Sequence, residues 1–138
     1  MNRNDFQKLA WVRLEEAKAL LDGGKFDGAY YLAGYCVECA LKACIAKRTQ
    51  PEEFPPGQRV VRRYYSHDLA DLVNAAELDE ERLRRSQVGT AFESNWSIVR
   101  QWKEVSRYDL HGEATAKELI DAIEHQVDGV FPWLRSFW

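Results

Sequence analysis

The sequence has 138 residues, of which 46% are hydrophobic and 30% charged, and these values predict one compact domain spanning residues 1–138. The formal net charge of −3 argues against a protein that coats nucleic acid nonspecifically, because such binding requires many cations to neutralise phosphates. The chain opens with charged sequence in place of an apolar signal core, and no apolar run reaches membrane-spanning length. We therefore expect a cytoplasmic protein that makes no contact with a membrane.

Two helices are predicted in the first third of the chain. Apolar residues recur three or four apart from Asp5 to Leu21, which is typical of an amphipathic helix, and Gly23-Gly24 ends it. The next segment, from Asp27 to Arg48, is apolar nearly all round. Such a helix is contacted on several sides, so we expect it at the centre of the fold.

A loop and two short helical segments follow. The stretch 49–65 cannot sustain a helix because it contains Pro51, Pro55, Pro56 and Gly57. Ser66 is the predicted N-cap of a short helix from His67 to Ala76. The acidic residues 79–81 then begin another turn or two, since carboxylates are favoured at a helix N-terminus.

Helical spacing returns from about Thr90 to Arg107, with Gly112 as a stop, and again from Glu113 to Val130. The aromatic tail, residues 131–138, must pack on its own core or on another chain, since exposed apolar patches usually bind something. No alternating strand pattern is present. The sequence predicts an all-α fold, an antiparallel up-and-down four-helix bundle with extra short helices.

The three cysteines, Cys36, Cys39 and Cys44, fall in the predicted central helix, where packing as small buried hydrophobes fits better than a disulfide framework. The first two have C-x-x-C spacing, but a structural zinc site needs four ligands, and His67 is the only other donor nearby in sequence. We expect no metal and no other cofactor.

Glu38 and Lys42 lie four residues apart in this apolar helix, so they share a face and can pair. One interpretation is a structural ion pair at the edge of the core, because a buried carboxylate needs such a partner. The other is that Glu38 faces a cleft and takes part in function.

Cations and aromatic rings come together at the end of the predicted loop. This combination can bind phosphate and stack on bases. Alternatively, the tyrosines anchor the loop to the core and the arginines are solvated. The residues concerned are Arg59, Arg62, Arg63, Tyr64, Tyr65 and His67.

Arg107 and His111 are the strongest candidates for chemistry. They are four apart, hence on one face if the helix from Thr90 reaches that far. A guanidinium can hold phosphate and stabilise developing charge, and an imidazole can move a proton near neutral pH, so the pair could cleave RNA without metal. Alternatively, His111 caps the helix C-terminus and Arg107 pairs with Asp109 or Glu104.

The run from Tyr30 to Ala43 resembles the second helix of HEPN domains. The remaining matches follow the order of that family: Ala17–Leu21, Gly24–Ala29, His67-Asp68-Leu69, Trp102 and Ser106-Arg107-Tyr108. The resemblance implies a helical bundle that usually forms a homodimer. Many members are RNases of toxin-antitoxin, phage-defence or RNA-processing systems, often beside a small nucleotidyltransferase-like antitoxin.

The resemblance also implies roles for particular residues. In the family, an Arg is followed after four to six residues by a His, with a polar residue of the second helix nearby, and two such sites meet at the dimer interface. Arg107 and Glu38 match the Arg and the polar residue, whereas His111 follows Arg107 after only three residues, and no tyrosine follows His111. The expected RNA or phosphate contacts are Lys42, Arg62, Arg63 and Tyr108.

Three hypotheses follow from these patterns. The first is a metal-independent endoribonuclease in which His111 moves protons and Arg107 stabilises the charged phosphorane. The second is a non-catalytic HEPN module that binds a nucleotide, RNA or a partner protein through the same cleft, because the Arg-His motif is shortened. The third is a structural scaffold in which Arg107 and Glu38 satisfy each other.

Overall fold

The computed structural model of the protein describes residues 1–49 and 64–138. All regular elements in these two ranges are helices, so the predicted all-α fold class is confirmed. None of the described helices combines the length and the apolar character needed to cross a membrane. In chain order the elements are α1 (Arg3–Asp22), α2 (Phe26–Arg48), α4 (Leu69–Ala75), α5 (Asp79–Val88), α6 (Thr90–Val99), the 3₁₀ helix η2 (Glu104–Tyr108), α7 (Glu113–Glu124) and α8 (Val130–Arg135).

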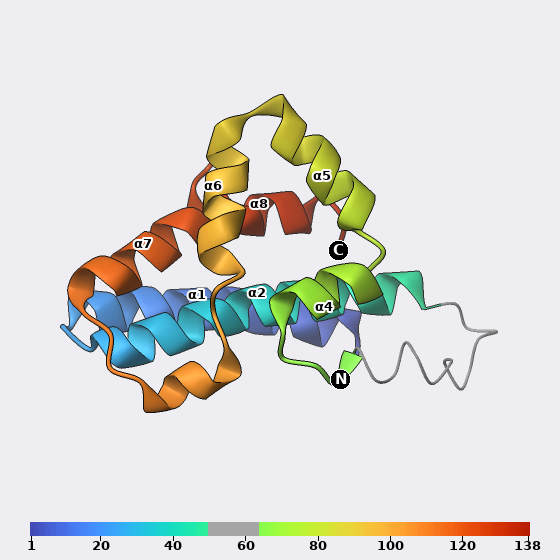
Figure 1. Ribbon diagram of the computed structural model, residues 1–138. Coiled ribbons are helices and arrows are strands. Elements are labelled where there is room, and N and C mark those ends of the chain that lie inside the picture. Colours follow the sequence, from blue (N-terminus) through green and yellow to red (C-terminus); the bar gives the residue numbers. More distant parts are fainter. Residues whose placement is uncertain (50–63) are drawn as a thin grey trace.

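Helices α1 and α2 form a long antiparallel pair (Figure 1). The side chain of Asn2 accepts a hydrogen bond from the backbone N–H of Asp5, and the Asp5 carboxylate accepts one from the backbone N–H of Asn2. This reciprocal cap satisfies two N–H groups that have no partner within the helix. After α1, Gly24 adopts a φ of +74°, which glycine reaches without the steric cost of a Cβ, and the chain reverses into α2.

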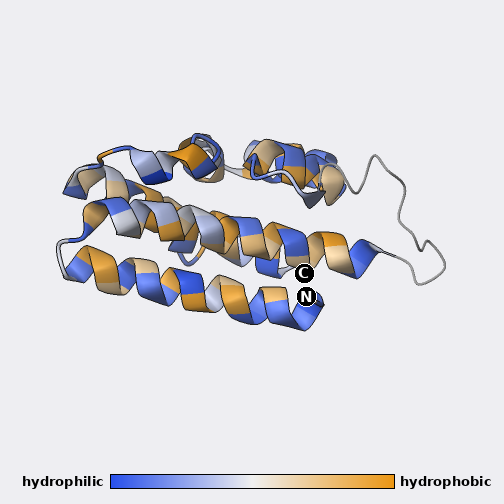
Figure 2. Cartoon of the chain, turned by 90° about the horizontal axis from the view of Figure 1, so that it is seen from below, coloured by the Kyte–Doolittle hydropathy of each residue, from blue (hydrophilic) through white to orange (hydrophobic). Residues whose placement is uncertain are grey.

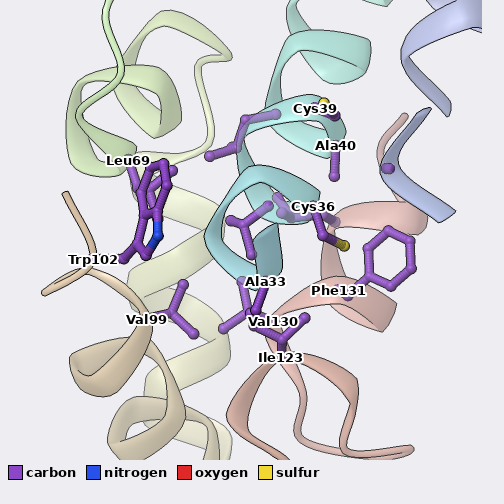
Figure 3. Packing of buried hydrophobic residues seen from close by; sticks show 14 of the residues in the cluster. Ala33, Cys36, Cys39, Ala40, Leu69, Val99, Trp102, Ile123, Val130 and Phe131 are labelled. Atoms are coloured by element: carbon purple, nitrogen blue, oxygen red, sulfur yellow. The ribbon is translucent and has the colours of Figure 1, made fainter. Parts of the chain in front are cut away.

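Helix α2 is the centre of the fold, as its sequence predicts. It packs against α1, α4, α7, α8 and η2. Hydrophilic and hydrophobic residues alternate along α1 (Figure 2), and its buried residues Phe6, Ala10, Leu14 and Ala17 recur three or four positions apart. Figure 3 shows Trp102 beside Leu69 on one side of α2 and Phe131 beside Cys36 on the other, so both sides of this helix are covered by distant parts of the chain.

The prediction of one helix from Thr90 to Arg107 was wrong, because α6 ends at Val99. The chain turns there and places the side chain of Trp102, which is fully buried, flat against Gly34 of α2. Burying so large an aromatic surface outweighs continuation of the helix. The chain then forms η2, so Arg107 lies on a separate short helix.

The prediction of a helix from Glu113 to Val130 was also wrong, because α7 ends at Glu124. The His125 Nδ1 atom accepts hydrogen bonds from the backbone N–H groups of Val127 and Asp128, which stabilises a turn. A new helix, α8, begins at Val130 and includes Pro132 in its first turn, where the missing N–H of proline carries no cost. The aromatic tail therefore packs largely on its own core, with Phe131 and Leu134 buried and Trp133, Phe137 and Trp138 partly buried against it.

Two further boundaries differ from those predicted. Asp68 caps α4 in place of Ser66, since its side chain accepts a hydrogen bond from the backbone N–H of Asp71. Helix α5 is longer than the turn or two that its acidic start predicted, and it forms a hairpin with α6 (Figure 1). Most of the predicted loop at 49–65 lies outside the described residues.

Candidate functional site

Glu38 is the buried acid of helix α2, with only 2% of its surface exposed. Its Oε1 atom lies 2.9 Å from Lys42 Nζ and 2.9 Å from His67 Nδ1. The predicted pairing of Glu38 with Lys42 is confirmed, and His67 is a second partner. The other carboxylate oxygen, Oε2, is buried and has no hydrogen-bond partner within residues 1–49 and 64–138.

His67 lies between two carboxylates from different parts of the chain. While Nδ1 contacts Glu38, Nε2 lies 3.6 Å from Oε2 of Glu104. The His67 side chain is 40% exposed, so the imidazole links the buried acid of α2 to the surface. Next to it, the Asp68 carboxylate pairs with Lys103 at 2.6 Å, and the hydrogen bond from Lys103 lowers the pKa of Asp68.

Arg107 is the outermost member of this set. Its guanidinium lies 3.4 Å from Glu104 Oε1 and 4.8 Å from the centre of the Tyr108 ring. Hydrogen bonding to Tyr31, followed by Tyr108 and the charge of Glu104, raises the pKa of Arg107 further above its already high ordinary value. Its side chain is 46% exposed and the Tyr108 residue is 76% exposed, so both can contact a bound molecule.

These contacts form a continuous ionic chain across three parts of the sequence. It runs from Lys42 and Glu38 in α2, through His67 before α4, to Glu104 and Arg107 in η2. A charge at the buried end is thereby coupled to the exposed guanidinium by successive short contacts, an arrangement that can fix the position of that guanidinium.

His111 takes no part in the ionic chain. Its ring stacks on Tyr30 with 3.9 Å between ring centres and 19° between planes, and its backbone N–H donates to the carboxylate of Asp27. Burial raises the pKa of Tyr30. The His111 Nε2 atom is buried and has no hydrogen-bond partner in the described part of the chain.

Arg107 and His111 do not share a helix face. Helix η2 ends at Tyr108, and Asp109 is extended with φ −98° and ψ 153°, so the helix does not reach His111. For the same reason His111 does not cap this helix, although the alternative pairing of Arg107 with Glu104 is present. Both residues contact α2, where Arg107 hydrogen-bonds with Tyr31 and His111 stacks on the adjacent Tyr30.

The predicted phosphate-contacting residues fall into three groups. The Lys42 side chain is 13% exposed; its Nζ bonds Glu38 and lies 5.4 Å from the centre of the Tyr64 ring, so it serves the interior of the site. Tyr108 is exposed beside Arg107. Arg62 and Arg63 lie outside the described residues.

Sequence reasoning missed the bridging position of His67 and the contact from Tyr31 to Arg107. Both depend on segments that are distant in sequence, since 29 residues separate His67 from Glu38. The available signal was chemical: His67 is an ionisable residue at the start of a helix, and Glu104 lies three residues before Arg107.

The cysteines of α2 are free and buried, as packing in an apolar helix predicts. Burial raises the pKa of the Cys39 thiol to about 11 and that of Cys44 to about 12. Among residues 1–49 and 64–138, no three His, Cys, Asp or Glu side chains come together as metal ligands.

Comparison with known protein families gives a match that covers most of the chain. The model of the HEPN domain family matches residues 5–128. The protein therefore belongs to the HEPN family, as the run from Tyr30 to Ala43 and its surroundings predicted. Searches of curated proteins and of solved structures returned no significant match.

Proposed function

We propose that this HEPN protein binds RNA or a nucleotide phosphate through Arg107. The observation that carries the proposal is the Arg107 guanidinium, whose side chain is 46% exposed while it contacts Glu104 and hydrogen-bonds with Tyr31. A guanidinium can contact two phosphate oxygens in a planar fork. Tyr108 offers an exposed ring on which an unstacked base can lie, a common feature of single-stranded RNA sites.

Binding is the function that this geometry supports best, because the histidine assigned to proton transfer, His111, does not present its Nε2 atom to solvent. A general base must come within hydrogen-bond reach of the proton that it takes. His111 Nε2 is buried under the stack with Tyr30, and His111 shares no contact with Arg107.

A metal-independent endoribonuclease is the second candidate, favoured by the uncommitted Nε2 atom of His111. That nitrogen has no hydrogen-bond partner among the described residues, so a substrate could provide one if the exposed segment around Leu110 shifts. The RNA 2′-hydroxyl would lose its proton to His111 and attack the adjacent phosphorus. The bond to the 5′-oxygen would break with a proton returned to that oxygen, which leaves a cyclic phosphate and a 5′-hydroxyl.

We also propose a homodimer formed around η2. Three apolar side chains flank Arg107 and are largely exposed: Val105 at 64%, Tyr108 at 76% and Leu110 at 90%. Such a group of exposed apolar residues is characteristic of an interaction surface. A dimer there would bring two Arg107 side chains near each other. The toxin-antitoxin or defence setting, a nucleotidyltransferase-like antitoxin partner and the cytoplasmic location stay predictions that rest on the family and on composition.

One experiment separates binding from cleavage. Purified protein is incubated in EDTA with a fluorescent single-stranded RNA pool, and both bound fraction and product ends are measured for the wild type, Arg107→Ala and His111→Ala. We expect binding that is weakened about tenfold in Arg107→Ala and retained in His111→Ala, without cleavage. Cyclic-phosphate ends that disappear in both variants would establish the nuclease. Binding and product ends that are both unaffected by Arg107→Ala would contradict both proposals.

A matched control is available in α5. Arg84 pairs with Glu81 within three residues, as Arg107 pairs with Glu104, and its side chain is 63% exposed. Helix α5 contributes no buried residue, so Arg84→Ala removes one exposed cation without disturbing the core. It should bind RNA like the wild type.

A further inference from the structure

We infer that His67 is a positioning residue that controls Arg107 through Glu104, and that the protonation state of His67 sets how firmly Arg107 is held. This inference deepens the proposed function, because the group that it controls is the one proposed to bind phosphate. His67 need not touch the bound molecule. It would act from within the protein, through the ionic chain.

The first step is the bridging geometry. The imidazole Nδ1 lies 2.9 Å from Glu38 Oε1, and Nε2 lies 3.6 Å from Glu104 Oε2. Glu38 is fixed because it is buried in α2 and also bonded to Lys42. The fixed end of the bridge is therefore in the core, and the end that can move is Glu104 on η2.

The second step is the number of donors that the imidazole provides. A neutral imidazole has one N–H donor and one acceptor nitrogen, whereas ionised carboxylates only accept. The imidazolium form suits both carboxylates, because its Nδ1–H donates to Glu38 at 2.9 Å and its positive charge pairs with Glu104, which lies 3.6 Å from Nε2. When the imidazole is neutral, one of its two ring nitrogens carries no hydrogen. The lone pair on that nitrogen then faces a carboxylate oxygen, and the two repel each other. Because Nδ1 makes the shorter contact, the contact to Glu104 is the one released.

The third step is the link from Glu104 to the phosphate-binding group. The second oxygen of Glu104 lies 3.4 Å from the Arg107 guanidinium, so a shift of the carboxylate changes the support of Arg107 directly. In the described chain, the charged groups near His67 balance, with three carboxylates and three cations, and the imidazolium adds one positive charge to a face proposed to meet phosphate. The groups are Glu38, Lys42, Asp68, Lys103, Glu104 and Arg107.

Packing alone does not account for this bridge. The side chain of His67 is 40% exposed, so it contributes little to the core. The start of α4 is tied to the approach to η2 by a separate ion pair, Asp68 with Lys103 at 2.6 Å. A substitution of His67 should therefore leave the two segments connected and the protein folded.

The first test uses the protein without RNA. The side-chain Nε–H signal of Arg107 is followed by NMR during a pH titration, with Arg107→Lys to assign it. We expect the signal to shift in step with the His67 ring signals in the wild type, and to lose that response in Glu104→Gln. His125 is the control, since its ring caps a turn elsewhere, and His125→Gln should keep the response. An Arg107 signal that ignores the titration of His67 would overturn the inference.

The second test uses RNA affinity as a function of pH. We expect wild-type affinity to fall as the pH rises through the titration of His67, and His67→Gln to lose that part of the dependence and to bind about twofold to fivefold more weakly at low pH. The double variant His67→Gln/Glu104→Gln should bind no more weakly than the worse single variant, because both act through one contact. An unchanged pH profile in His67→Gln would count against the inference. If the Arg107 signal follows the protonation of His67 but the wild type binds no RNA, the proposed function is rejected and the inference about His67 stands.

Discussion

The indole ring of Trp102 lies against the backbone of Gly34, so close that a Cβ at residue 34 would overlap the ring. Both residues are buried, and Trp102 is among the largest fully buried side chains of the protein. This contact sets the direction of the chain as it leaves α6 and enters η2. It therefore lies directly upstream of Glu104 and Arg107 and positions the segment that carries them.

Replacing Gly34 by Ala should displace Trp102 and destabilise the protein. Overpacking of a filled core typically costs about 1–3 kcal/mol, and here the neighbour is a rigid ring that cannot move aside cheaply. Urea unfolding followed by tryptophan fluorescence gives the free energy of unfolding. Gly112→Ser is the control, because a Cβ there meets nothing within 4 Å and serine is a favourable N-cap. Equal stability of the two variants would contradict this packing account.

Removing Lys42 should be costly because it leaves Glu38 with less compensation for its buried charge. Breaking a buried pair by deleting one partner costs on the order of 3 kcal/mol. We expect Lys42→Met to lower the free energy of unfolding by about that amount, while the double variant Glu38→Met/Lys42→Met recovers most of it. Lys47→Met, at an exposed position of the same helix, should have little effect. A double variant as unstable as Lys42→Met would show that the carboxylate is not the cause.

The ion pair of Asp68 with Lys103 should make stability depend on pH in the acid range. The pKa of Asp68 is lowered in the folded protein from an ordinary value of 3.8, chiefly by the hydrogen bond from Lys103. A carboxyl group whose pKa is lower in the folded state than in the unfolded state stabilises the fold at any pH above its unfolded-state pKa. This contribution is lost as the pH falls through its folded-state pKa. Because both side chains are partly exposed, we expect Lys103→Met to cost only about 0.5 kcal/mol at pH 7.

Lys103→Met should be as stable as the wild type at a pH where Asp68 is protonated in both the folded and the unfolded state. That pH lies below the ordinary pKa of 3.8 and also below the lowered pKa of Asp68 in the folded protein. Thermal unfolding from pH 7 to pH 2.5 measures the difference. A deficit of constant size over the whole range would mean that Lys103 acts through packing of its aliphatic chain.

The cysteines should be inert in the native protein. Cys36, Cys39 and Cys44 are buried, and burial raises the pKa of all three thiols. Because the thiolate is the reactive form, an aromatic disulfide reagent at pH 8 should label none of them until the protein unfolds. Rapid labelling of one thiol under native conditions would show that α2 is less well covered than described.

The parts of the molecule that the sequence predicted well are those set by local spacing. The α1 and α2 helices, and the pairing of Glu38 with Lys42, follow from residues three or four positions apart. The break after Val99 was missed because Trp102 falls at the same spacing that a continuing helix would give. Only the contact with Gly34, far away in sequence, shows why the chain turns there.

The sequence identified several residues of the candidate site but not how they are arranged in space. Arg107 and Glu38 were identified, but the expectation that Arg107 and His111 share a face depended on a helix that ends too early. The bridge through His67 could not be predicted from one sequence, because it joins three segments that only tertiary packing brings together. The family resemblance indicated which residues belong to the site, and the contacts in the structure show how those residues are connected.

The most direct test of the account is the salt dependence of RNA affinity in the wild type, Arg107→Ala and Arg84→Ala, measured by fluorescence anisotropy. Each phosphate contact to a single strand contributes about 0.7 to the slope of log affinity against log salt. The account predicts that Arg107→Ala loses about that much slope and about tenfold in affinity, while Arg84→Ala loses neither. Identical slopes and affinities for all three proteins would show that Arg107 is not the phosphate-binding group.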